Sequence, residues 1–345
     1  MTPYYICYAI LILSVAAGLL LDKMRVATIL AFIPMFVLIA GRGMVGTDSA
    51  NYVQSFDIIR YQGMLASNFE PGFTLLVEVL NWAFRDSLDV LIVLGSATAI
   101  IMLSAGLLLE RSPLLFLTII MPFFLIDMSI NGLRYGLAFA IVALGAAAFA
   151  RGSLRVFILC GVIATSIQIS SVLLVVGLWA LMEVRIKTFI GVALGMAAIL
   201  IVFGSYLEDK ISQNTDAVGL GGLSGIVPLV ATVGVVVAIR YSDRPIIASK
   251  FPLFAILGMQ LASFGLARFY YAGLRFQTLF VFLLYLFVAM SVRRSAVQLS
   301  GQRLLTGSLL ATLLLCSVSR LSNFRDDTSG FSPFNPFYFQ SELKG

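Results

Sequence analysis

The chain has 345 residues, of which 60% are hydrophobic and 12% charged, and its formal net charge is +6. A soluble domain carries about twice that charged fraction, so the composition excludes an ordinary soluble protein and indicates an all-α, polytopic integral membrane protein. Histidine is absent, which excludes His-ligated metal sites, Ser-His-Asp triads and any imidazole base.

Apolar stretches recur from end to end of the chain, separated by short polar connections. They cover 3–21, 26–41, 88–109, 113–126, 132–150, 154–183, 188–206, 226–240, 251–267, 274–292 and 304–320. The stretch 154–183 is too long for one ordinary crossing and polar residues interrupt its middle, so we expect two short helices that meet near Gln168. This predicts about twelve transmembrane helices in one integral domain, 1–345.

The charges of the loops predict the orientation. No basic residue precedes the first stretch, and Lys23 and Arg25 follow it, which predicts a retained span with its N-terminus outside. One set of alternate loops holds thirteen basic and four acidic residues, giving +9; the other holds ten basic and thirteen acidic, giving −3. Basic loops stay in the cytoplasm, so the second set and both termini are expected on the periplasmic side of a bacterial inner membrane. The basic excess therefore requires no nucleic acid as a partner.

Three segments are expected on the periplasmic side: the main loop 42–87, a second loop 207–225 and the tail 321–345. Within the main loop, 70–84 is apolar but short. We expect a re-entrant or interfacial helix there, with Pro71 in its first turn and Glu70 near its positive N-terminus.

Ionisable residues at the outer helix ends are candidates for a site, because such groups are costly near lipid unless they pair or face water. Asn131 and Arg134 are three residues apart, which predicts that they share a helix face. Asp127 and Arg134 are alternatively a structural ion pair. Asp48 is alternatively an N-cap for the helix that contains Tyr52.

Several arginines from separate outer loops indicate an anionic ligand, because arginine binds phosphate oxygens in a bidentate manner. A lipid-linked diphosphate would fit, although Arg268 and Arg275 could equally reach phospholipid headgroups. If sugar is transferred from such a carrier, arginine stabilises the leaving diphosphate and a carboxylate takes the proton of the acceptor hydroxyl. The available carboxylates are Asp48, Glu70 and Asp127.

Other classes of function compete with glycosyl transfer. A transporter or flippase of lipid-linked oligosaccharides would need polar residues near mid-membrane on several helices and an internal repeat, and the sequence has no such repeat. A membrane acyltransferase that modifies the polymer is disfavoured by the lack of histidine. A structural subunit of an export complex would leave the outer arginines unexplained.

Four motifs together resemble a known family. The run from Arg42 to Asp48 with Tyr52, followed by Glu70-Pro71-Gly72-Phe73, is similar to the N-terminal signature of EpsG-type membrane proteins, which belong with the Wzy-like exopolysaccharide and O-antigen polymerases. Asn131-Gly132-Leu133-Arg134 resembles the family's Asn-x-(Ile/Leu)-Arg element. The chain departs from the family at Gln168-Ile169-Ser170, where His-x-Ser is usual, and at Tyr135, where Gln is common.

The resemblance implies a membrane glycosyltransferase that polymerises repeat units carried on undecaprenyl diphosphate at the periplasmic face. It implies a lipid-linked oligosaccharide as substrate, membrane lipids as surroundings and a chain-length regulator protein as a candidate partner. No cofactor and no metal site are expected, although a divalent cation is left open. The expected catalytic residues are Asp48, Glu70 and Arg134; the expected substrate-binding residues are Arg42, Tyr52, Asn131, Gln168, Arg268 and Arg275.

Overall fold

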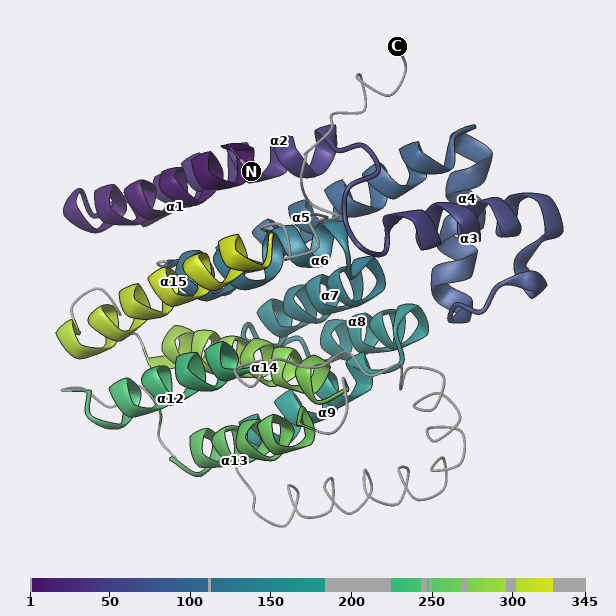
Figure 1. Cartoon of the computed structure of the whole chain (residues 1–345). Coiled ribbons are helices and arrows are strands. Elements are labelled where there is room, and N and C mark those ends of the chain that lie inside the picture. Colours follow the sequence, from purple (N-terminus) through teal and green to yellow (C-terminus); the bar gives the residue numbers. More distant parts are fainter. Residues whose placement is uncertain are drawn as a thin grey trace. The chain divides into compact units, whose positions relative to one another are not determined.

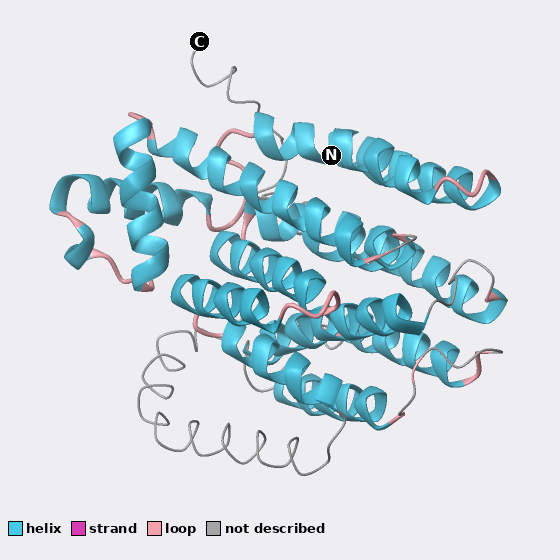
Figure 2. Ribbon diagram, turned by 180° about the vertical axis from the view of Figure 1, so that it is seen from behind, coloured by secondary structure: helices cyan, strands magenta, loops and turns pink. Residues whose placement is uncertain are grey.

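The computed structural model describes residues 2–110, 113–183, 225–242, 247, 250–268, 272–295 and 302–324. All regular elements in these ranges are helices, joined by loops, and none is a strand (Figures 1 and 2). It forms two compact units. Unit 1 comprises Met1–Val172, Gln298–Ser300 and Leu309–Gly345, and unit 2 comprises Leu173–Val297 and Gly301–Ser308.

Unit 1 is a bundle of long apolar helices with a pair of shorter helices. Its elements are α1 (Thr2–Leu20), α2 (Met24–Gly41), α3 (Ser49–Gln62), η1 (Met64–Ala66), α4 (Pro71–Ala83), α5 (Ser87–Leu109), η2 (Phe116–Leu125), α6 (Ile126–Ile130), α7 (Leu133–Phe149), α8 (Leu154–Ile167) and, from Leu309 on, α15 (Arg303–Asn323). Helices α1 and α2, α2 and α5, α5 and α7, and α7 and α8 pack against each other in turn.

Unit 2 contains α12 (Ile226–Arg240), α13 (Phe251–Leu266), α14 (Ala272–Ser295), most of α9 (Ser171–Glu183) and the first turns of α15. Helices α12, α13 and α14 all contact one another. The buried side of α14 is rich in large apolar residues such as Phe282, Tyr285 and Phe287, and these form the core of this unit.

The helices confirm most of the predicted stretches. Five of them are long and apolar enough to cross a membrane: α1, α2, α5, α14 and α15. Six shorter apolar helices account for the other described stretches. The division of 154–183 is confirmed, since α8 ends at Ile167 and α9 begins at Ser171. The count of twelve stays a prediction, and the stretch 188–206 and nearly all of the loop 207–225 lie outside the described residues.

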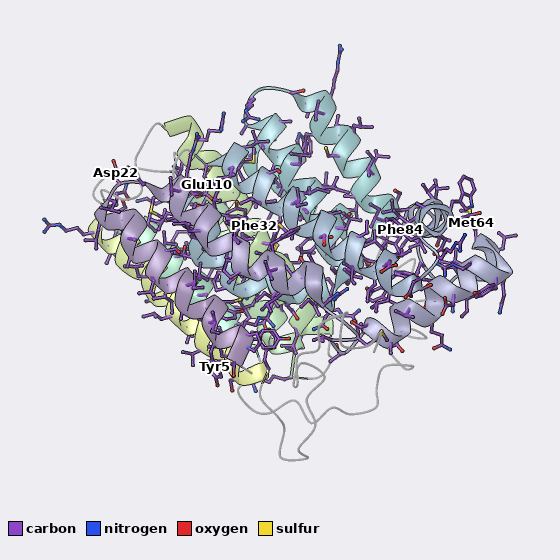
Figure 3. The ribbon with its side chains drawn as sticks, turned by 90° about the horizontal axis from the view of Figure 1, so that it is seen from above. Tyr5, Asp22, Phe32, Met64, Phe84 and Glu110 are labelled. Atoms are coloured by element: carbon purple, nitrogen blue, oxygen red, sulfur yellow. The ribbon has the colours of Figure 1, made fainter. Side chains whose placement is uncertain are left out.

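The loops assigned to opposite sides of the membrane meet at opposite ends of unit 1. At one end, Arg151 after α7 donates a hydrogen bond to the carbonyl of Leu108 at the end of α5 (3.2 Å). At the other end, the rings of Tyr4 and Phe324 are 4.7 Å apart, so the start of α1 lies beside the end of α15. Figure 3 likewise shows Asp22 and Glu110 toward one end of this unit and Met64 and Phe84 toward the other.

Helices α3 and α4 cross each other and form a pair set off from the long helices (Figure 1). As predicted, Pro71 occupies the first turn of α4 and Glu70 its N-cap position. Arg60 joins the end of α3 to the end of α4, since it donates to the Asn81 side chain (2.8 Å) and to the carbonyls of Phe84 (3.2 Å) and Arg85. With thirteen residues, α4 is about 20 Å long, which is short of the ~30 Å hydrocarbon core.

The helix before the motif arginine has an unexpected form. Residues Phe116–Leu125 are π-helical, and all ten side chains are buried. Pro122 lies within this segment; it has no N–H and its ring crowds the preceding turn, which a wider helix accommodates. The hydroxyl of Tyr8 donates to the Pro122 carbonyl (3.0 Å), so a side chain of α1 stabilises the π-helical segment.

Candidate active site

Arg134 and Glu70 form the centre of the site. Arg134, in the first turn of α7, places its Nη1 atom 2.5 Å from Glu70 Oε2. Its guanidinium also lies over the Phe69 ring, with Cζ 4.6 Å from the ring centroid. Two consecutive residues before α4 thus fix one side of the guanidinium. Both partners of the ion pair keep part of their surface exposed, so the pair is accessible.

A cluster of four aromatic side chains supports this pair. Tyr52 and Phe56 of α3 pack against Phe69 and Phe73, with ring centroids 5.3 to 6.3 Å apart. Burial raises the pKa of the Tyr52 hydroxyl, and the neighbouring Arg134 guanidinium opposes that shift. The hydroxyl is therefore neutral at physiological pH and faces the motif arginine.

Asn131 connects the motif helices to the loop after α2. Its side-chain oxygen accepts a hydrogen bond from the Thr47 N–H (2.9 Å), and its side-chain nitrogen donates to Asp127 Oδ1 (3.0 Å). The other oxygen of Asp127 lies 3.3 Å from Arg320 Nη1, at the end of α15. Arg320 in turn lies over the Phe123 ring (4.6 Å). A chain of polar contacts therefore runs from the last helix to the loop before α3.

This arrangement corrects two local expectations. Asn131 does not share a helix with Arg134, because it is the C-cap residue of α6 and Gly132 separates it from α7. The alternative ion pair between Asp127 and Arg134 does not form either. Asp127 pairs with Arg320, and Arg134 pairs with Glu70. The sequence carried no signal for these long-range partners, because charge and spacing alone do not say which loops meet.

Arg42, the first residue of the loop 42–48, is completely buried. Its two terminal nitrogens donate to the carbonyls of Ile130 (2.7 Å) and Leu91 (3.4 Å). Burial lowers the pKa of Arg42 to about 10, so the side chain remains a cation at neutral pH. Ile130 is the last residue of α6, where the helix dipole favours a positive charge. Arg42 therefore holds the turn from which Asn131 and Arg134 extend.

Asp48 stands at the N-cap position of α3, as the structural alternative predicted, but its carboxylate makes no capping hydrogen bond. Only its backbone carbonyl serves the helix, accepting from the Tyr52 N–H (2.9 Å). The side chain is half-buried and contributes to the electrostatic surroundings of the Tyr52 hydroxyl. The carboxylate is thus close to the aromatic cluster without having a capping role.

Gln168 lies at the break between α8 and α9, with only 6% of its surface exposed. Helix α8 reaches the site because α4 packs on it and Gly72 contacts Ser166. A Cβ added at Gly72 would lie 2.3 Å from Ser166 Oγ and 2.8 Å from its carbonyl carbon. A side chain is therefore excluded at position 72. The first turn of α4 thus contacts α8 at Ser166, two residues before Gln168.

Unit 1 thus brings together seven of the predicted site residues, from five separate segments. They are Arg42, Asp48, Tyr52, Glu70, Asn131, Arg134 and Gln168. The other two belong to unit 2: Arg268, after α13, is exposed and lies over the Phe264 ring (4.6 Å), and Arg275 is exposed in the first turn of α14. Among the described residues, no group of three or more His, Cys, Asp or Glu side chains could hold a metal ion.

Comparison with known proteins identifies one family. No curated protein and no solved structure matches the chain. A model of the EpsG family matches residues 25–335, which include every element of the site. The chain therefore belongs to the EpsG family.

Proposed function

We propose that the protein is a Wzy-like polysaccharide polymerase. It transfers a growing glycan from an undecaprenyl-diphosphate carrier to the next lipid-linked repeat unit, at the periplasmic face of the inner membrane. Family membership supports a polysaccharide polymerase-like function in general. The observation that carries the specific mechanism is the accessible ion pair between Arg134 and Glu70, in which a phosphate-binding cation and a carboxylate share one place.

Arg134 binds and stabilises the leaving diphosphate in this mechanism. A guanidinium has five N–H donors; Glu70 accepts from Nη1, and Tyr52 also hydrogen-bonds to the Arg134 side chain. Arg134 Nε is buried and has no hydrogen-bond partner. Phe69 and Glu70 hold the plane of the group, so its remaining donors are oriented before a ligand arrives. Such preorganised donors are typically worth about 10²–10³-fold in rate.

A carboxylate accepts the proton of the acceptor hydroxyl. The hydroxyl oxygen attacks the anomeric carbon, the bond from that carbon to the phosphate oxygen breaks, and its electron pair leaves with the diphosphate. The released proton goes to Glu70 or to Asp48. Glu70 is the better placed, because phosphate bound at Arg134 would take over part of the guanidinium and leave the Glu70 carboxylate freer to accept a proton.

The other residues position these groups. We assign Arg42 and Asn131 to holding the loop 42–48 against the turn between α6 and α7, because their donors and acceptors are directed at backbone atoms there. Tyr52 orients Arg134 from the aromatic cluster. Arg268 and Arg275 are proposed as substrate-binding residues of unit 2. A lipid-linked oligosaccharide, membrane lipids and a chain-length regulator are the proposed partners.

The test compares Arg134→Lys and Arg134→Ala with the wild type in cells that lack the chromosomal copy, at matched membrane expression. We expect single lipid-linked repeat units to accumulate in both variants. Lysine retains the charge but loses the planar fork, so polymer synthesis should fall about 10²-fold or more. The readout is the size distribution of lipid-linked material.

Arg155→Ala is the matched control, because Arg155 is an exposed arginine in the first turn of α8. It should leave long polymer unchanged. Normal polymer in Arg134→Ala would remove Arg134 from the site. If the wild-type gene has no effect on polymer length, the polymerase function itself is wrong. Glu70→Gln and Asp48→Asn in the same assay rank the two carboxylates by their residual rates.

A further inference from the structure

The break between α8 and α9 contains a group of buried polar atoms without partners. Gln168 Oε1, Ser170 Oγ and Ser171 Oγ are all buried, and none of them has a hydrogen-bond partner. Gln168 is 6% exposed and Ser171 is 0% exposed. Three such atoms lie within four consecutive residues, and a buried polar atom without a partner destabilises the fold.

Neither serine lies inside a helix, because Ser170 is in the break and Ser171 is the first residue of α9. Hydroxyl groups inside helices commonly donate to the carbonyl four residues earlier, as Thr98 and Ser104 do here (2.8 Å each). Ser170 and Ser171 make no such bond. Gln168 has an extended backbone, with φ −149° and ψ 110°, and this interrupts the helix where an unbroken one would satisfy the backbone more simply.

The break also lies near the first turn of α4. Gly72 contacts Ser166 so closely that no side chain fits between them. Gly72 is two residues from Glu70, and Ser166 is two residues from Gln168. The break therefore begins two residues after a direct contact between α8 and the first turn of α4.

The chemistry of these atoms differs from that of the arginine. Gln168 Oε1 is an acceptor and requires a donor, whereas an ionised diphosphate presents only acceptor oxygens. Serine hydroxyls donate and accept. A sugar offers several hydroxyl groups that do both, so it matches this set of atoms, while the diphosphate matches Arg134.

We propose that Gln168, Ser170 and Ser171 form a hydroxyl-binding subsite for a sugar of the lipid-linked repeat unit. This inference rests on the proposed function and names the part of the substrate that this break recognises. Sugar hydroxyls complete the hydrogen bonds of the three side chains. The amide at position 168 thereby selects a hydroxyl donor next to the reacting bond.

The experiment uses the full-length protein in detergent and two probes. One is the free repeat-unit oligosaccharide, released from its lipid carrier and carrying no diphosphate; the other is inorganic diphosphate. Binding is measured by calorimetry, and thermal unfolding is recorded for the same samples. The variants are Gln168→Met, which keeps the size of the side chain, and the pair Ser170→Ala with Ser171→Ala. Ser104→Ala is the control, because its hydroxyl already has a partner.

We expect Gln168→Met and the double serine variant to weaken oligosaccharide binding about tenfold or more, which corresponds to ~1.4 kcal/mol. Diphosphate binding should be unchanged. The unfolding temperature should stay the same or rise, because unsatisfied buried polar atoms have been removed. Ser104→Ala should affect neither probe.

Two results would overturn the subsite. If both variants bind the oligosaccharide like the wild type, the atoms are satisfied by water alone. If the unfolding temperature falls together with the affinity for both probes, the residues are structural. A polymerisation assay on the same wild-type sample reports separately on the proposed function, so loss of the subsite and loss of the polymerase hypothesis give different results.

Discussion

At the scale of single residues, the site depends on a few contacts between atoms far apart in sequence. The Thr47 N–H meets the Asn131 side chain across 84 residues, and Arg42 meets the Ile130 carbonyl across 88. Each contact places the loop 42–48 on the turn before α7. Gly46 lies in this loop with φ +110°, a conformation that side chains rarely adopt. The loop therefore tolerates very little change at this position.

Gly46→Ala should destabilise the protein and lower its activity. A Cβ there would lie 2.4 Å from Asn131 Oδ1 and 2.8 Å from the Ile130 side chain, so the Asn131–Thr47 bond must break or the loop must move. We expect a loss of roughly 1–3 kcal/mol, measured as a lower unfolding temperature in detergent, together with less polymer.

Gly63→Ala is the matched control for this effect. Gly63 also has a positive φ, of +85°, but a Cβ there would meet nothing within 4 Å. It should lose only about 1–3 kcal/mol from the unfavourable backbone conformation (φ 85°, ψ 174°) and keep its activity. Equal effects in the two variants would show that the contact with Asn131 contributes nothing.

At the scale of elements, α4 combines two surfaces. One side carries Phe73 and Val77 and is buried within unit 1. The other carries Leu75, Val79 and Trp82, spaced four and three residues apart, and all three are exposed. An exposed apolar stripe on a short helix next to the spans is typical of a helix that lies in the membrane interface. This agrees with the interfacial alternative predicted from the sequence.

The two tryptophans of the chain permit a direct test. In Trp179→Phe, the fluorescence comes from Trp82 alone. If α4 lies in the interface, lipids brominated near the headgroup end of the acyl chain should quench this fluorescence more strongly than lipids brominated near the chain end. Trp82→Phe, which leaves only Trp179, provides the reference. Quenching of Trp82 by neither lipid would place α4 in water.

Helix boundaries were the part of the fold that the sequence predicted best, because a run of apolar residues long enough to cross a bilayer seldom forms anything except a membrane helix. The break at Gln168 was predicted for the same reason, since polar residues interrupt an overlong run. The π-helical form of Phe116–Leu125 was missed, because Pro122 alone does not distinguish a kink from a widened helix. The motif residues were predicted from family resemblance, but their partners were not. Glu70 pairs with Arg134 and Arg320 pairs with Asp127 only because the fold brings these distant segments together.

At the scale of the whole molecule, the site defines one end of unit 1. The loop 42–48, the turn between α6 and α7, and Phe324 all belong to this end, and Tyr4 of α1 packs there as well. The prediction that both termini lie on the side of the main loop is thus compatible with the contacts within unit 1. We propose that this end is periplasmic.

Cysteine labelling tests that orientation. The native Cys7, Cys160 and Cys316, which are buried, are first replaced by Ala or Ser so that only introduced thiols can react. Thr47→Cys and Lys23→Cys then introduce exposed thiols at opposite ends of α2. A membrane-impermeant maleimide should label intact spheroplasts only at position 47, and label position 23 only after permeabilisation. The reverse pattern would place the site in the cytoplasm and exclude a periplasmic polymerase.

The ion pair between Asp127 and Arg320 also has a consequence for biogenesis. The two residues are 193 positions apart (320 minus 127), and a ribosome adds about 5–20 residues per second. Asp127 therefore waits roughly 10–40 s in the membrane before its partner has been synthesised. During that time it is a charged group without its cation, at the very turn that positions the motif arginine. The nascent chain can insert most of the helices of unit 1 early, yet the candidate site is completed only when α15 arrives.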